Sequence, residues 1–124
     1  MYLLDTNVVS ELRKAPTGKA DPNVIKWASN THPEMLYLSV ITVLELEMGI
    51  LLMERRDQHQ GSLLRRWLEH QVLPAFDGRI LSVDTAVARK CAELHVPDRR
   101  AERDAMIAAT ASIHRMKVVT RNVA

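Results

Sequence analysis

Four short runs of strand-forming residues alternate with longer stretches of helical periodicity along this chain. The runs are rich in Val, Ile, Leu or Tyr and are too short to be amphipathic helices. They cover residues 2–4, 36–40, 79–83 and 117–120. Strands separated by helices predict an α/β fold, with a mainly parallel sheet of about four to five strands and helices on both faces.

The stretches between these runs carry start and stop signals of helices. Asp21-Pro22 places a capping carboxylate before a first-turn proline, and Asp84 is placed to cap the helix over 85–94. The helices over 42–56 and 62–72 are expected to pair as an antiparallel hairpin. The predicted helices cover residues 7–14, 22–30, 42–56, 62–72, 85–94 and 101–115.

The composition fits one compact domain over residues 1–124. Hydrophobic residues make up 47% and charged residues 26% of the 124 residues, so a core can form without disulfides. The formal net charge of +2 is too small for a chain that coats nucleic acid, so any basic surface is local. The single cysteine, Cys91, fits a reducing cytoplasm, and Glu45 and Glu47 oppose membrane insertion of the apolar stretch 36–53.

Acidic residues stand near the carboxyl ends of the predicted strands, where functional groups of a parallel sheet collect. Asp5 directly follows the first strand. Glu45 lies on the helix after the second strand, on the side that carries Ser39 and Thr42. Asp104 heads a stripe of small and apolar residues that is expected to face the sheet. The stripe consists of Ile107, Ala108 and Ala111.

Each of these acids also has an ordinary structural explanation. Asp5 can cap the helix after it, and Glu45 can be a favourable acid in the first turns of a helix. Asp104 can form an ion pair with Arg100 or Arg103. If the three carboxylates instead converge, they repel one another unless a multivalent cation neutralises them. Oxygen ligands select Mg²⁺ or Mn²⁺, which activate water and stabilise charge on a phosphodiester.

Other polar residues point to no further chemistry. Asp84 is explained as a helix cap, and Glu47 and Glu54 are expected on a solvent-exposed face. The arginines of the middle helices are expected on solvated faces and in ion pairs within their own helix. They are Arg55, Arg56, Arg65 and Arg66. The five histidines lack paired metal-ligand spacing and are expected at the surface.

The sequence resembles the PIN-domain ribonucleases, and within them the FitB-like branch of the VapC-type toxins of bacterial toxin–antitoxin pairs. The resemblance spans nearly the whole chain and implies a three-layer PIN-like fold. It rests on Leu-Leu-Asp-Thr-Asn-Val-Val-Ser-Glu at 3–11, Leu-Ser-Val-Ile-Thr-Val-Leu-Glu-Leu-Glu-Met-Gly at 38–49, Asp104 with Ile-Ala-Ala-Thr-Ala at 107–111, and Val-Thr-Arg-Asn at 119–122.

The resemblance implies an endoribonuclease that depends on Mg²⁺ or Mn²⁺, with water as the nucleophile and no covalent enzyme intermediate. It assigns metal coordination and catalysis to Asp5, Glu45 and Asp104. Asn122 stands where many relatives have a fourth acid, so a second metal is left open. The supporting residues are Thr6, Asn7, Thr42 and Thr120, and the candidate RNA contacts are Arg99, Arg100 and Arg103.

The resemblance also implies partners. Members of the family commonly form homodimers and are inhibited by an antitoxin with a ribbon-helix-helix or AbrB-like DNA-binding domain. We therefore expect an RNA substrate, a cognate antitoxin and a homodimer, in the cytoplasm and without a membrane. Ala124 precedes the acidic and aromatic continuation usual after the last strand, so a further C-terminal segment is expected.

Two alternatives to the nuclease stay open at the level of sequence. One is a phosphatase or phospho-acceptor domain that uses Asp5 as a nucleophile, although such a phosphatase would want an aspartate in place of Asn7. The other is a catalytically weak subunit that binds an antitoxin, which the amide at Asn122 suggests.

Overall fold

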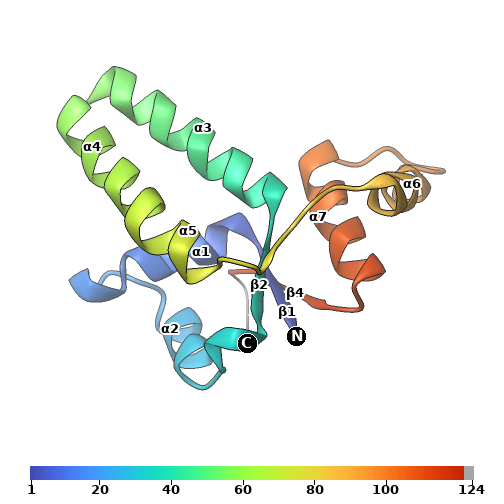
Figure 1. Cartoon of the computed structure of the whole chain (residues 1–124), viewed down its shortest axis with the longest axis horizontal. Helices are drawn as coiled ribbons and strands as arrows, with labels where there is room; N and C mark the ends of the chain where they lie inside the picture. Colours follow the sequence, from blue (N-terminus) through green and yellow to red (C-terminus); the bar gives the residue numbers. More distant parts are fainter. Residues whose placement is uncertain (122–124) are drawn as a thin grey trace.

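The computed structural model describes residues 1–121, and at its centre lies a four-stranded sheet (Figure 1). The strands are β1 (Tyr2–Leu4), β2 (Leu36–Ser39), β3 (Ile80–Leu81) and β4 (Lys117–Val119). Their order is β3-β2-β1-β4, and every neighbouring pair is parallel. The predicted parallel sheet is therefore confirmed, with four strands in the described part of the chain.

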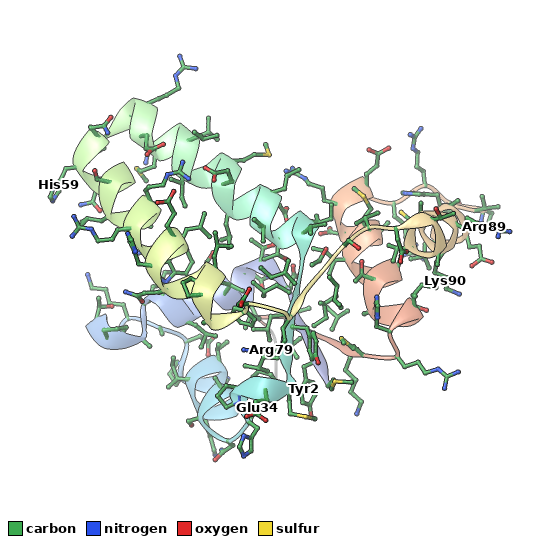
Figure 2. The ribbon with its side chains drawn as sticks, in the orientation of Figure 1. Tyr2, Glu34, His59, Arg79, Arg89 and Lys90 are labelled. Atoms are coloured by element: carbon green, nitrogen blue, oxygen red, sulfur yellow. The ribbon has the colours of Figure 1, made fainter. Side chains whose placement is uncertain are left out.

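Strand β3 is shorter than the predicted run over 79–83. It pairs with β2 through Leu38 and Ser39, and β2 ends at Ser39 because the next helix begins there. Chain beyond Leu81 therefore has no ladder partner. Arg79, next to β3, donates from Nη1 to the carbonyl of Pro33 at 2.7 Å and also to that of Leu36. Figure 2 shows its side chain near the start of β2, where it ties this edge of the sheet together.

Helices fill the chain between the strands, and polar side chains cap most of the longer ones. Asp5, Asp21, Ser39, Asp57 and Asp84 each accept a hydrogen bond from a backbone N–H at the start of a helix. The expected caps at Asp21 and Asp84 are confirmed. The helices are α1 (Thr6–Arg13), α2 (Pro22–Ser29), α3 (Val40–Arg56), α4 (Gln58–Trp67), α5 (Leu73–Ala75), α6 (Thr85–Leu94) and α7 (Glu102–Ile113).

Short helical turns complete the connections. These are 3₁₀ turns at Ala15–Thr17 and Pro33–Met35 and a π-helical turn at Leu68–Val72 between α4 and α5. No helix among the described residues is both long and apolar enough to cross a membrane.

Two apolar clusters lie on opposite faces of the sheet, because successive strand residues point to opposite sides. Leu4, Leu36 and Leu38 join one cluster, which α1 to α5 cover. Leu3 lies in the other cluster with Ile107 of α7, and Tyr37 packs against it. Figure 1 shows α6 and α7 on one side of the sheet and the other helices opposite. The fold is therefore the three-layer α/β arrangement that the resemblance implied.

Helices α3 and α4 form the predicted hairpin, with a tighter connection than expected. Asp57 alone separates them, since it ends α3 and caps α4. A Cβ atom at the buried Gly61 would lie 2.6 Å from Glu54 Cα, so glycine is required for the close approach. Arg65 of α4 binds Glu47 at 2.5 Å and Glu54 at 3.2 Å. The expectation of a solvated face for Glu47 and Glu54, and of a pair within one helix for Arg65, was wrong, because the hairpin brings charges of the two helices together.

Candidate metal-binding acidic site

Asp5 lies at the carboxyl end of β1, where the chain turns into α1. Its backbone N–H donates to the carbonyl of Val119 at 2.9 Å, which fixes it to the last residue of β4. Its carboxylate accepts a hydrogen bond from the Thr6 N–H at 2.8 Å and caps α1. Asp5 is thus both the helix cap and a carboxylate at the sheet edge. The position is the crevice beside β1 and β4, where the strand order reverses.

Glu45 is held by a hydroxyl network at the start of α3. The Thr6 hydroxyl donates to Glu45 Oε1 at 2.7 Å and lies 3.2 Å from the hydroxyl of Thr42, which is fully buried. Because a threonine hydroxyl has one hydrogen and Glu45 accepts it, Thr42 is the donor in the second contact. Thr42 and Glu45 therefore lie on one side of α3, as predicted, and Thr6 joins them, while Ser39 caps the helix.

The second half of that side of α3 differs from the first. Ser39 and Thr42 are fully buried, whereas Met48 and Leu52 further along are 44% and 66% exposed. Leu44 and Leu51 add to the same exposed apolar surface. We call these four residues the α3 apolar surface.

Asp104 lies in the first turn of α7 and is exposed, which corrects the expectation that it heads a buried stripe. Ile107 and Ala111 do pack against the sheet, but Ala108 is exposed. The first turn of α7 therefore lies outside the layer that covers the sheet. Among the described residues, no ion pair within 4.0 Å involves Asp104, so the expected alternative of a pair with Arg100 or Arg103 was wrong.

The three carboxylates share one electrostatic environment. Burial raises the pKa of the Asp5 carboxyl above its ordinary value of 3.8, and the hydrogen bond from Thr6 N–H partly opposes that rise. The negative charges of Asp104 and Glu45 raise the pKa of Asp5 further. The sequence-predicted acids are therefore close enough for their charges to interact.

Glu45 and Asp104 also line one open pocket of about 590 Å³. Ala101, Glu102 and Arg103 complete its lining. Within residues 1–121, however, no three His, Cys, Asp or Glu side chains lie close enough together to hold one metal ion. Glu45 and Asp104 thus face a common space, but they and Asp5 do not converge on one point.

Three predicted supporting residues lie near Asp5, with different degrees of involvement. Thr6 contacts Glu45, as described, and Asn7 accepts a hydrogen bond from the Arg121 N–H at 3.1 Å. Thr120 follows β4 and is exposed. Asn122 lies outside the described residues.

The three predicted RNA-contacting arginines differ in their partners. Arg99 is 3.4 Å from Glu102, and Arg100 donates from Nε to the carbonyl of Leu94 at 3.1 Å. Arg103 Nε lies 3.7 Å from Glu45 Oε2. The sequence analysis missed this last contact, since the two residues are far apart in the chain and only packing brings α3 beside α7.

Glu11 is a second residue whose position the sequence analysis missed. Only 4% exposed, it accepts a hydrogen bond from the Asp21 N–H at 2.8 Å and pairs with Lys14 and Arg121 at 3.5 and 3.8 Å. The only signal in the sequence was that Glu11 is the last residue of the segment 3–11, which carries the family resemblance around Asp5. Glu11 joins α1 to the chain that follows β4 and so supports the geometry around Asp5.

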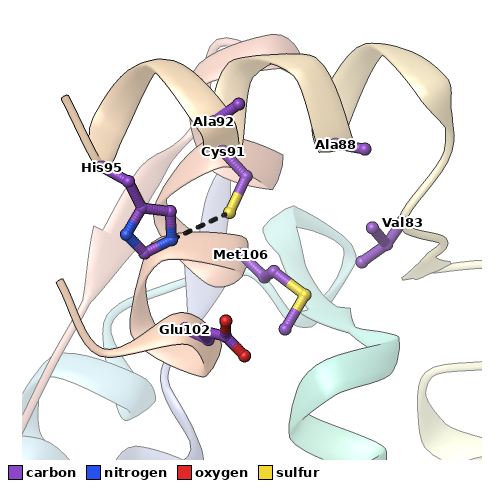
Figure 3. A pocket seen from close by; sticks show the side chains of 7 residues that line it. All are labelled: Val83, Ala88, Cys91, Ala92, His95, Glu102 and Met106. Atoms are coloured by element: carbon purple, nitrogen blue, oxygen red, sulfur yellow. Dashed lines mark hydrogen bonds between the residues drawn. The ribbon is translucent and has the colours of Figure 1, made fainter. Parts of the chain in front are cut away.

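A separate, mainly apolar pocket of about 340 Å³ lies between α6 and α7 (Figure 3). Cys91 Sγ is 3.8 Å from His95 Nε2, and the other ring nitrogen accepts a hydrogen bond from the Arg100 N–H at 3.0 Å. The expectation of a surface position was wrong for the half-buried His95, because helical spacing sets it beside Cys91. The other four histidines are exposed, and Figure 2 shows His59 at the free end of the α3–α4 hairpin.

Comparison with known proteins gives full-length matches. A family model described as the PIN domain matches residues 2–123. The VapC ribonuclease Y4jK of Sinorhizobium fredii is 39% identical, with 98% of this chain and 87% of that protein covered. The toxin FitB of Neisseria gonorrhoeae is 40% identical, with 98% and 88% covered.

The fold comparison agrees. The crystal structure of FitAcB from Neisseria gonorrhoeae matches with a TM-score of 0.87 at 37% identity, over 98% of this chain and 88% of that chain. The structure of FitAB bound to a DNA fragment matches with a TM-score of 0.86 at 36% identity, over 98% of this chain and 85% of that chain.

Proposed function

This chain belongs to the PIN-domain family, with relatives of the VapC and FitB type, and on that premise we propose that it is a metal-dependent endoribonuclease. In this proposal it acts as the toxin of a toxin–antitoxin pair. The observation that carries the proposal is the pocket shared by Glu45 of α3 and Asp104 of α7, whose negative charges both act on the Asp5 carboxylate at the end of β1. The relative from Sinorhizobium fredii, named a VapC ribonuclease, supports the reaction type.

The donor chemistry of the site fits a hard divalent cation. Its side-chain donors are carboxylate and hydroxyl oxygens. Burial is the main cause of the raised pKa of Asp5, and the negative charges of Asp104 and Glu45 add a repulsion that a cation would relieve. We propose that Asp5, Glu45 and Asp104 hold Mg²⁺ or Mn²⁺, drawing closer together than they are in this structure. When bound, such an ion activates water for attack and neutralises charge that develops on the phosphodiester.

The protein's own groups orient these acids. The Thr6 hydroxyl and N–H each hold one carboxylate, those of Glu45 and Asp5, so one residue sets the orientation of two donors. Thr42, buried beneath them, holds the Thr6 hydroxyl in place. Hydrogen bonds of this kind to metal-binding carboxylates fix the ligands before the ion arrives.

The RNA contact is proposed on the α7 side of the pocket. Arg100 and Asp104 line a second pocket of about 410 Å³, which adjoins the one lined by Glu45. Together with Arg99 and Arg103, Arg100 forms a local cluster of guanidinium groups that can bind RNA phosphates. Because the net charge is only +2, we expect RNA to be attracted by this local cluster and not by the protein surface as a whole.

The partner is proposed to be a cognate antitoxin, with a second copy of this chain in the assembly. The relative FitB is named a toxin, and the matching structures are titled FitAcB and FitAB, the second bound to a DNA fragment. In this chain the α3 apolar surface, which begins beside Glu45, is exposed over Leu44, Met48, Leu51 and Leu52. An antitoxin segment that covers this surface would also reach the acidic pocket and block it.

The test is cleavage of end-labelled total tRNA and a panel of structured RNAs by the purified protein in Mn²⁺, Mg²⁺ or EDTA. Asp5→Asn from the same preparation is the matched control, because asparagine keeps the oxygen that accepts the Thr6 N–H. Discrete products that require the metal and are lost in the variant would establish the nuclease. Products that persist in Asp5→Asn would come from a contaminant, and metal binding without products would favour a subunit that only binds its antitoxin.

A further inference from the structure

The carboxylate oxygen Oε2 of Glu45 faces the positive charge of Arg103 instead of another carboxylate. Glu45 Oε1 is taken by the Thr6 hydroxyl at 2.7 Å, whereas Oε2 lies 3.7 Å from Arg103 Nε. Arg103 immediately precedes Asp104 in the first turn of α7. Glu45 Oε2, the oxygen available to a metal ion between α3 and α7, is thus already next to the positive charge of Arg103.

The contact between Arg103 and Glu45 is loose. It is a single long approach through Nε and lacks the paired short hydrogen bonds of a strong arginine–carboxylate pair. The Arg103 side chain is 48% exposed, and its Nη1 rests 3.4 Å from the sulfur of Met48. A guanidinium held only by such contacts can leave without breaking any buried interaction.

Space for that movement is present at the same place. The pocket of about 590 Å³ is lined by Glu45, Arg103 and Asp104 together, and it is open to solvent. A divalent ion that binds both Glu45 and Asp104 would enter between the two acids. Two positive centres cannot share the Glu45 oxygen at such short range without strong repulsion.

We propose that Arg103 is the resident cation of the metal-free site, and that it and a divalent ion exclude one another at Glu45. This inference rests on the proposed function, since it takes Glu45 and Asp104 as metal-binding residues. Metal entry moves the guanidinium from Glu45 to the mouth of the pocket, on the side assigned to RNA. There it meets a phosphate group, for which an arginine fork is well suited.

The experiment measures Mn²⁺ binding to the full chain by the electron paramagnetic resonance signal of free Mn²⁺, at fixed ionic strength and without RNA. Arg103→Gln is expected to bind Mn²⁺ about three- to fivefold more tightly than wild type, the change that loss of a weak competing ion pair gives. Arg103→Lys, which keeps a charge on a flexible stem, should lie between the two.

Arg99→Gln is the matched control, because it removes the same charge from the approach to α7 but from a residue paired with Glu102. Equal tightening by both variants would mean general electrostatics and would overturn the inference. Unchanged or weaker binding in Arg103→Gln would also overturn it. In either case the proposed function stands if wild type binds Mn²⁺ and Asp5→Asn does not.

Absence of Mn²⁺ binding in wild type and Arg103→Gln alike would remove the metal site itself, and the proposed function with it. Binding that appears only in Arg103→Gln would be the strongest support, since it would show that the arginine occupies the site in the natural protein.

Discussion

The two sides of the acidic site are built differently. On the β1 and α3 side, Asp5 and Glu45 are held by Thr6 at 2.8 and 2.7 Å, above the fully buried Thr42. On the α7 side, Asp104 is exposed, and Ala101, the residue before the helix, offers no side-chain cap. One side is therefore fixed by folding, while the other is free to adjust when a ligand arrives.

This difference predicts that substitutions on the two sides affect stability and activity differently. Residues of the fixed side contribute to stability as well as to function, because their hydrogen bonds are part of the folded core. The exposed residues in the first turn of α7, such as Asp104, contribute little to the free energy of unfolding, so the effect of changing them is expected in function. Four measurements test this division.

The largest effect is expected for Asp104→Asn, which removes a charge needed to hold the cation. Cleavage should fall by more than about 100-fold, beyond the loss typical of a residue that only supports a metal ligand. The free energy of unfolding should change by less than about 0.5 kcal/mol, because Asp104 is exposed. Initial cleavage rates and urea denaturation measure the two quantities.

Asp98→Asn is the matched control for that variant, an exposed aspartate outside the pocket that should leave both quantities unchanged. Unchanged cleavage in Asp104→Asn would take Asp104 out of the site. A large loss of stability would contradict the division between the two sides.

A smaller loss of activity, joined to a loss of stability, is expected for Thr6→Val. The substitution leaves Glu45 Oε1 without its donor and Thr42 without its partner. Cleavage should fall about 10- to 100-fold, and the free energy of unfolding about 1–2 kcal/mol. Thr6→Ser, which keeps the hydroxyl, should retain most of both. If Thr6→Val is as stable as wild type, the fixed side is not held as the structure indicates.

A pH-dependent gain in stability is expected for metal-free Asp5→Asn. Because the folded protein raises the pKa of Asp5, ionisation of Asp5 costs stability as the pH rises through and above 3.8. Asparagine removes that cost, so the variant should be more stable than wild type at pH 7 and similar to it below pH 3.8. Thermal unfolding in EDTA across this range measures the difference.

Addition of Mn²⁺ should reverse that order, since only wild type gains stability from the bound ion. A variant less stable than wild type at pH 7 in EDTA would mean that the hydrogen bond from Thr6 N–H outweighs burial and repulsion at Asp5.

The smallest effect on the isolated protein is expected for Leu52→Lys on the α3 apolar surface. Leu52 is 66% exposed, so the free energy of unfolding should change by less than about 0.5 kcal/mol and RNA cleavage should be unchanged. Affinity for the proposed cognate antitoxin should fall, as measured by isothermal titration calorimetry. Undiminished affinity would place the antitoxin on another surface.

The alternation of strand-forming and helical segments was sufficient to predict the parallel sheet and most helix boundaries. Residues 85–94 were predicted as a helix and form α6, because Asp84 caps it and the signals are local. The end of β3 and the one-residue connection at Asp57 between α3 and α4 were less predictable, since each depends on where a neighbouring element ends. Helix and strand boundaries that depend on local signals can be predicted from the sequence. Boundaries that depend on a neighbouring strand or helix cannot.

For the site, the sequence by itself determined which acids are present and that strand ends bring them toward one edge. Periodicity predicted that Glu45 shares a side of its helix with Thr42, because helical spacing needs no tertiary information. The tertiary structure alone decided that Thr6, next to Asp5, also holds Glu45, that Asp104 is exposed, and that Arg103 faces Glu45. These contacts join residues up to 58 positions apart, and only the packing of α1, α3 and α7 around the sheet sets such distances.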